Sequence, residues 1–194
     1  MRKMAAFLLS LVIVCTISAH SFAAESPYDE NGSRVVYSWE NPNWEEELYG
    51  DAGTDNMVQP RYGEREEITV VGTEEKMFFT DPEGQPEEGF RFSGSGGAIF
   101  INSGGGSPVE VSLSLGWGPI SISVAPGEAS KSSVGGILVN IPSDGYYHKV
   151  KLMYTCMFTR TRIDQYRGTE YLGTAYRTDY TVKKIDAIEY RVVW

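Results

Sequence analysis

Cysteine and histidine are nearly absent from this chain, whose 194 residues include two of each, Cys15, Cys156, His20 and His148. Zinc clusters and iron–sulfur centres need several such ligands, so both classes of site are excluded. We therefore expect no metal and no cofactor. Without the predicted signal peptide described below, one Cys remains, and a single Cys forms no internal disulfide.

Basic residues are also scarce, because 17 Lys and Arg stand against 26 Asp and Glu, a net charge of -9. A dedicated DNA or RNA binder needs a basic surface to neutralise phosphates, so no nucleic-acid partner is expected. Hydrophobic residues make up 41% and charged residues 22% of the chain, which is ordinary for a protein with a folded core. The length suits one domain, or one domain with a tail.

Residues 1–24 have the pattern of a secretory signal peptide. Arg2 and Lys3 supply the positive start, and a mostly apolar run of 13 residues follows over positions 5–17. That run is too short to span a membrane comfortably. Small residues precede the expected cleavage point, after Ala23 or Ala24. The sequence therefore predicts a secreted protein, and the short signal together with the missing disulfides is typical of bacteria.

The charge is unevenly distributed along the chain. Residues 25–95 hold 18 acidic and 5 basic residues, whereas residues 96–194 hold 8 acidic and 10 basic ones. Turn and coil signals dominate up to about Glu66, so residues 25–66 are predicted to be a flexible, acidic N-terminal arm of low order. The alternative is that this arm docks on the basic parts of the nearly neutral back half through Trp39, Trp44 and Tyr49.

Residues 67–194 are predicted to form a domain of β-strands. The clearest pattern is the alternation of apolar and polar residues over 109–115, which resumes over 120–124 after a Gly-Trp-Gly-Pro insert and so predicts a hairpin. A long strand is expected over 146–162. Shorter strands are expected at 68–71, 77–79, 98–101, 137–141, 180–182 and 188–192. The fold class is therefore all-β, an antiparallel β-sandwich or a barrel-like domain.

Catalytic signatures are missing from the sequence. His148 and Cys156 stand eight residues apart, which is roughly 26 Å along an extended strand. Cys156 also falls on the apolar face of its strand, where a buried, inert thiol is expected. We therefore predict no enzyme. A glycosidic hydrolase using a carboxylate pair drawn from Glu110, Asp164 and Glu170 stays open as an alternative.

Tyrosine and arginine are interleaved near the C-terminus, and this segment is the best candidate for a ligand-binding surface. Aromatic rings stack on the apolar faces of sugars, and Arg pairs with carboxylate or phosphate groups. The alternative is an ordinary sheet with aromatic cross-strand pairs and solvated charges. The predicted ligand-binding residues are Arg160, Arg162, Tyr166, Arg167, Tyr171, Tyr176 and Arg177.

These observations predict a secreted, non-enzymatic binding or structural module that acts on an extracellular or cell-surface polymer, either anionic or carbohydrate. The alternative is a toxin-like or antimicrobial effector that engages membranes through its amphipathic hairpin. The Ser/apolar alternation of that hairpin resembles the composition of membrane-inserting hairpins in pore-forming toxins. Its predicted arms of five to seven residues are shorter than the 9–11 or so residues that a spanning strand needs, so membrane contact is the second expectation.

Overall fold

The computed structural model describes residues 28–49, 63–102, 105–130 and 136–193, so the predicted signal peptide and its cleavage site lie outside the described residues. Within these ranges the chain forms nine strands and one short helix. They are β1 (Ser33–Glu40), α2 (Trp44–Tyr49), β2 (Glu64–Thr80), β3 (Gly97–Asn102), β4 (Val109–Leu115), β5 (Gly118–Val124), β6 (Glu128–Ser130), β7 (Ile137–Ile141), β8 (Tyr147–Arg167) and β9 (Glu170–Val192). No helix in the described ranges is long and apolar enough to cross a membrane.

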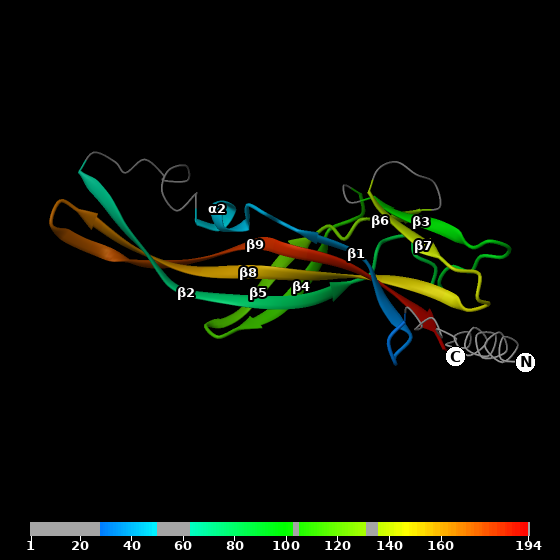
Figure 1. The fold of residues 1–194 in the computed structure, drawn as a ribbon. Helices are drawn as coiled ribbons and strands as arrows, with labels where there is room; N and C mark the ends of the chain where they lie inside the picture. The colour runs from blue at the N-terminus through cyan, green and yellow to red at the C-terminus, as the bar shows by residue number, and fades with distance from the viewer. Residues whose placement is uncertain (1–27, 50–62, 103–104, 131–135, 194) are drawn as a thin grey trace, which may run out of the picture.

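The longest elements build one elongated antiparallel sheet with the strand order β1-β9-β8-β2. Strands β8 and β9 have 21 and 23 residues, and at about 3.3 Å per residue they extend for roughly 70 Å. They form a hairpin that turns at Gly168, whose φ of 62° lies in the left-handed region that favours glycine. Figure 1 shows this hairpin, with β2 beside it, running to one end of the molecule. We call this end, at Gly168, the distal end.

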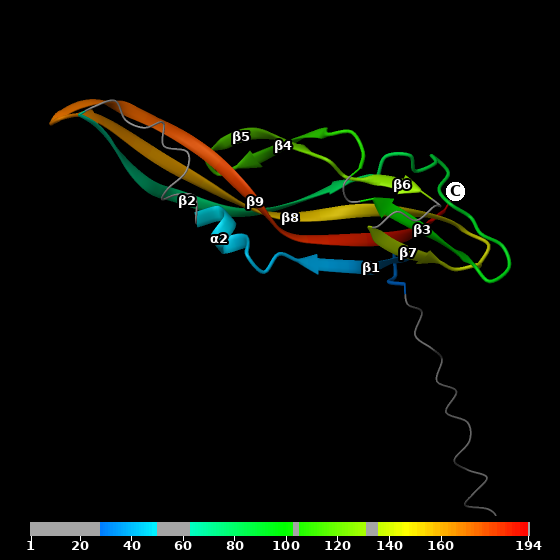
Figure 2. The ribbon, with the colours of Figure 1, turned by 90° about the horizontal axis from the view of Figure 1, so that it is seen from above.

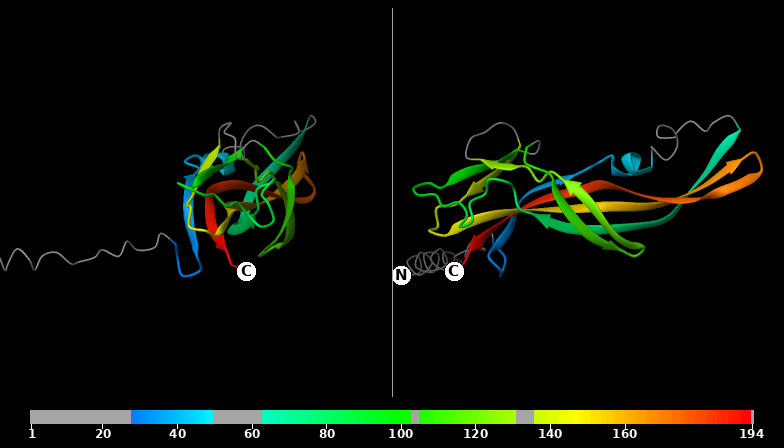
Figure 3. Two further views of the ribbon diagram at one scale, coloured as in Figure 1. Left: turned by 90° about the vertical axis from the view of Figure 1, so that its right-hand side faces the viewer. Right: turned by 180° about the vertical axis from the view of Figure 1, so that it is seen from behind.

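A second layer covers one face of the sheet. The small sheet β6-β3-β7 lies over the end opposite the distal end, and the β4–β5 hairpin crosses the middle obliquely (Figures 1 and 2). Buried side chains of β8, such as Leu152 and Phe158, pack between the layers with Ile99 and Val139 of the small sheet. Figure 3 shows the two layers end-on and from behind. The prediction of an all-β, antiparallel fold is confirmed.

Part of the predicted N-terminal arm belongs to this fold. Strand β1 pairs with β9 from Ser33↔Tyr190 to Glu40↔Lys184, which differs from the low order expected for residues 25–66. The chain continues into α2, and Lys183 of β9 lies 5.2 Å from the centre of the Trp44 ring. The reason is non-local, because the outer edge of β9 supplies the backbone groups that β1 needs. Over residues 33–49 the arm is therefore docked, through the pairing of β1 and through Trp44, whereas the other two expected anchors, Trp39 and Tyr49, are exposed.

Candidate functional site

The β4–β5 hairpin is a layer of its own. Among the described residues its two strands pair only with each other, from Val109↔Val124 to Leu115↔Gly118. Its inner face packs on the long sheet, and its outer face carries four exposed serines together with Glu110 and Pro119. The inner side chains are Val111, Leu113, Leu115, Ile120, Ile122 and Val124, and the outer serines are Ser112, Ser114, Ser121 and Ser123. The hairpin can therefore leave the long sheet without breaking a strand pairing that the structure describes.

The hairpin is also almost free of charge. Between Phe92 and Gly127 the sequence holds a single charged residue, Glu110, although charged residues make up 22% of the whole chain. Exposed strand faces in soluble proteins ordinarily carry Lys and Glu, which guard against association. An outer face of serines with Glu110 as its one charged residue is therefore unusual for a water-exposed hairpin.

Three hydrogen bonds described at the hairpin attach it to the long sheet. The backbone N–H of Gly116 donates to Glu74 Oε2 at 2.7 Å, and Tyr180 donates to the carbonyl of Ser123 at 3.2 Å. Arg160 donates to the carbonyl of Trp117 at 3.4 Å. The bond from Gly116 is the largest cause that lowers the pKa of Glu74. The ionised Glu74 carboxylate thus holds the tip of the hairpin in place.

Trp117, at the tip, lies directly on Gly72 of β2. A Cβ placed on Gly72 would be 3.0 Å from Cζ3 of the Trp117 ring, so any side chain here requires the ring to move by a few tenths of an ångström. The indole Nε1 is buried and has no hydrogen-bond partner. A buried donor without a partner costs about 1–3 kcal/mol. The indole of Trp117 would therefore have a lower free energy where its N–H meets a hydrogen-bond acceptor.

Five of the predicted ligand-binding residues lie together, on the same sheet face as the hairpin and beyond its tip. Arg162 pairs across β8 and β9 with Tyr176, and Tyr166 pairs with Tyr171. The guanidinium of Arg160 lies 4.5 Å from the centre of the Tyr176 ring, and the Tyr166 and Tyr171 rings meet edge-on at 5.6 Å. We call these five residues the distal cluster. Because Arg160 also bonds the carbonyl of Trp117, the cluster adjoins the hairpin tip.

Ion pairs within the cluster set its charge. Arg162 forms two bonds to Asp164, at 3.0 and 2.9 Å, and Thr174 also donates to that carboxylate. The bond from Thr174 is the main cause that lowers the pKa of Asp164, with Arg162 contributing further, and Asp164 in turn raises the pKa of Arg162. Asp164, one of the three carboxylates considered for hydrolysis, therefore serves as an ion-pair partner here.

The other two predicted residues lie elsewhere. Arg177 pairs across the strands with Thr161, which puts it on the opposite sheet face, and it bonds Asp179 at 2.6 Å. Arg167 lies at the distal turn and bonds Glu64 at 2.9 Å. Strand alternation separates both from the distal cluster, because Arg177 follows Tyr176 directly and Arg167 follows Tyr166; the sequence prediction grouped these residues by type alone.

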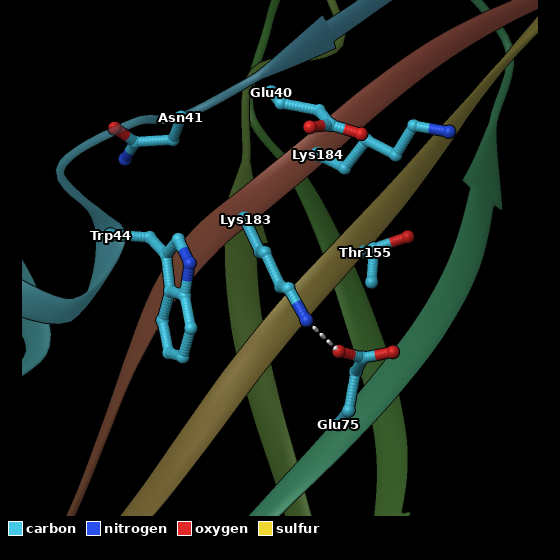
Figure 4. Close-up of a pocket in the computed structure, with 7 residues that line it drawn as sticks. All are labelled: Glu40, Asn41, Trp44, Glu75, Thr155, Lys183 and Lys184. Carbon is cyan, nitrogen blue, oxygen red and sulfur yellow. Dashed lines mark hydrogen bonds and ion pairs between the residues drawn. The ribbon is translucent and has the colours of Figure 1, made fainter.

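The opposite face of the sheet carries a pocket of about 300 Å³ that the sequence analysis did not find. Figure 4 shows Trp44 as one wall and Lys183 pointing from β9 toward Glu75 of β2, with Thr155 of β8 nearby. The Lys183 ammonium bonds Glu75 at 2.6 Å. The lining residues are Glu40, Asn41, Trp44, Glu75, Thr155, Lys183 and Lys184.

A bulge in β9 creates this pocket. The pairing passes from Thr155↔Lys184 to Cys156↔Val182, so Lys183 is an extra residue. Two consecutive lysines then reach the same pocket, which a regular strand would forbid because its side chains alternate between faces. The adjacent pair of lysines within an otherwise alternating strand was the available sequence signal.

His148, the only histidine outside the predicted signal peptide, is fully buried in an ion cluster. Its Nε2 lies 2.8 Å from Asp144 Oδ1, and its Nδ1 bonds the buried Glu189. Arg34 of β1 bonds the other oxygen of Glu189 at 2.6 Å. Outside this cluster, burial raises the pKa of the Cys156 thiol to about 12. Asp144 is four residues from His148 in the chain, whereas Glu189 and Arg34 are distant in sequence, so local spacing did not indicate the whole cluster.

Comparisons with known proteins give no further guidance, because no family model, no curated protein and no solved structure matches this chain.

Proposed function

We propose that this protein is a secreted, non-enzymatic effector that engages lipid membranes through its β4–β5 hairpin. The observation that carries the proposal is the hairpin itself, an almost charge-free amphipathic layer that pairs with no other described strand. It is attached by the three hydrogen bonds described above and by apolar packing. The membrane effector was the second expectation from the sequence. We prefer it here because the hairpin docks on the long sheet as a separate layer.

A bilayer can replace the long sheet as the apolar partner of the hairpin. Leu115, Ile122 and Val124 are buried against the sheet, and burying three such side chains stabilises docking by about 5–9 kcal/mol. The same side chains regain a similar free energy in the hydrocarbon of a bilayer. No charged side chain between Val111 and Gly127 has to be dehydrated. Trp117 gains a polar partner for its N–H, since indole rings favour the membrane–water interface.

The strand length decides the depth of the proposed contact. Each arm of the hairpin has seven residues, or about 24 Å at 3.4 Å per residue, which is less than the roughly 30 Å hydrocarbon core. We therefore propose that the hairpin lies in the interface, with its apolar face toward lipid and its serines toward the headgroups. The distal cluster beside the tip supplies Arg and Tyr side chains to anionic headgroups.

The non-enzymatic part of the proposal has separate support. Both ring nitrogens of His148 are bonded to carboxylates, so neither is available as a general base. With its pKa raised to about 12, the buried Cys156 is a thiol and not a nucleophilic thiolate at neutral pH.

Flotation with vesicles of phosphatidylcholine and phosphatidylglycerol, together with dye release, tests the proposal on residues 24–194. Leu113→Asp puts a charge on the lipid-facing side, and Ser112→Asp puts the same charge on the serine side of the same strand. We expect the wild type and Ser112→Asp to float, and Leu113→Asp to stay unbound. Because Leu113→Asp also weakens docking to the sheet, a loss of flotation reports on lipid contact and not on release. Equal flotation of both variants, or none by the wild type, contradicts the proposal.

A second candidate is the first expectation from the sequence, a module that binds an anionic cell-surface polymer through the distal cluster. The gathering of five predicted residues on one face favours it. Co-sedimentation with purified bacterial cell walls at low and moderate salt tests it. Arg162→Glu is compared with Arg177→Glu, because each Arg pairs with an Asp two residues on but the two lie on opposite faces. Salt-sensitive pelleting that only Arg162→Glu abolishes, without vesicle binding, would favour this candidate over the first.

A further inference from the structure

We propose that the pocket over the β9 bulge binds a single uncharged sugar unit. The site lies on the sheet face opposite the β4–β5 hairpin, so the proposal is independent of membrane binding. Its volume of about 300 Å³ lies at the small end of ligand pockets, about 300–1,000 Å³. One sugar ring therefore fits better than an extended chain.

The charges around the pocket select against an anion. Lys183 is paired with Glu75 at 2.6 Å, and Lys184 is paired with the buried Asp186 at 2.9 Å. Glu40, the remaining charged side chain of the lining, lies opposite Lys184 in the pairing of β1 with β9. Both ammonium groups are thus already neutralised, and no positive charge remains for a carboxylate or phosphate.

The paired charges still offer what sugar hydroxyls need. An ammonium group has three donors, so Lys183 and Lys184 keep protons beyond those used in their ion pairs. Glu40 and Glu75 carry acceptor oxygens at opposite sides of the pocket (Figure 4). A hydroxyl both donates and accepts, so neighbouring sugar hydroxyls match an alternation of ammonium and carboxylate groups.

Trp44 supplies the apolar wall, and its position is well supported. The backbone N–H of Asn41 donates to the Lys183 carbonyl at 2.9 Å, and its side-chain Nδ2 donates to Glu47 at 2.7 Å and to the Val182 carbonyl at 3.2 Å. These bonds tie the start of α2 to the bulge. An indole placed in this way gives the C–H face of a sugar a surface for stacking beside the Lys183 ammonium, which lies 5.2 Å from the ring centre.

Ligand-observed NMR titration tests the inference on residues 24–194. The probes are the neutral methyl glycosides of glucose, galactose and mannose, with glucuronate and glucosamine as charged counterparts. We expect at least one neutral glycoside to bind in the millimolar range, with an affinity that salt leaves unchanged. Trp44→Leu is expected to weaken this binding at least tenfold. Trp39→Leu is the matched control, because Trp39 alternates with Glu40 and so faces away from the pocket.

Two charge variants test the same inference without removing the wall. Lys183→Met leaves Glu75 unpaired and is expected to shift preference to glucosamine, whereas Glu75→Gln frees Lys183 and is expected to shift preference to glucuronate. No binding of any neutral glycoside would overturn the inference, as would salt-sensitive binding of glucuronate alone. Flotation with vesicles is measured on the same variants, so failure here and failure of membrane binding are distinguishable.

Discussion

Replacing Gly72 by Val should release the β4–β5 hairpin. The Cβ alone would come within 3.0 Å of Cζ3 and 3.3 Å of Cε3 of Trp117, and the two further methyl groups of Val cannot fit while the ring stays in place. Overpacking of this kind costs about 1–3 kcal/mol. If the cost falls on the docked state alone, the population of undocked hairpin rises about 5- to 140-fold.

The control is Gly173→Val in β9. Gly173 also lies in a strand and has a φ outside the left-handed region, but a Cβ there meets no atom within 4 Å. This variant therefore measures the effect of placing Val in the sheet without touching Trp117.

The assay combines vesicle flotation with tryptophan emission. We expect Gly72→Val to bind vesicles at lower lipid concentration than the wild type, and Gly173→Val to match the wild type. The link between undocking and membrane contact would be refuted by one result. In it, the emission spectrum shows that Trp117 has left the sheet in Gly72→Val, but this variant binds vesicles no better than the wild type.

Four further outcomes are expected. Folding lowers the pKa of Glu74, so the bond between Glu74 and the hairpin tip is fully formed above the ordinary value of 4.5 and is lost as the pH falls through the lowered pKa. Vesicle binding should rise in that acid range. Glu74→Gln should remove this pH dependence. Cys156 should resist thiol reagents at neutral pH until urea unfolds the protein. Phe158→Ala, at a fully buried site, should lower the free energy of unfolding by about 3–5 kcal/mol in urea titrations. Glu189→Gln removes one partner of a buried ion cluster and should cost a similar amount, about 3–5 kcal/mol.

Local alternation predicted the parts of the fold whose two faces differ. The hairpin expected at 109–115 and 120–124 agrees with β4 and β5, and the strand expected at 137–141 agrees with β7. One face of each strand packs on the core while the other is wet, so the period of two is visible in the sequence.

Strand continuity was less predictable. The segments 68–71 and 77–79 are parts of the single strand β2, which continues through Gly72 with a β-bulge between Val70 and Gly72. Gly72 was interpreted as a boundary because glycine often ends a strand. In the structure it instead makes room for Trp117, a contact across 45 residues that no local pattern reveals.

Of the two candidate sites, the sequence indicated the distal cluster but not the Trp44 pocket. Interleaved Tyr and Arg residues pointed to the distal cluster, since regular cross-strand pairing gathers them. The Trp44 pocket needs a helix from the predicted arm, a bulge in β9 and a carboxylate from β2. Each of these depends on tertiary contacts, so the pocket could not be assembled from sequence spacing.

Depth-dependent quenching of tryptophan by brominated lipids tests the central claim most directly. The wild type is compared with Trp117→Phe in vesicles carrying bromine at different acyl positions. The account predicts quenching that is strongest near the interface and that disappears with Trp117. Quenching that is absent, or that Trp117→Phe retains in full, would contradict membrane engagement through the β4–β5 hairpin.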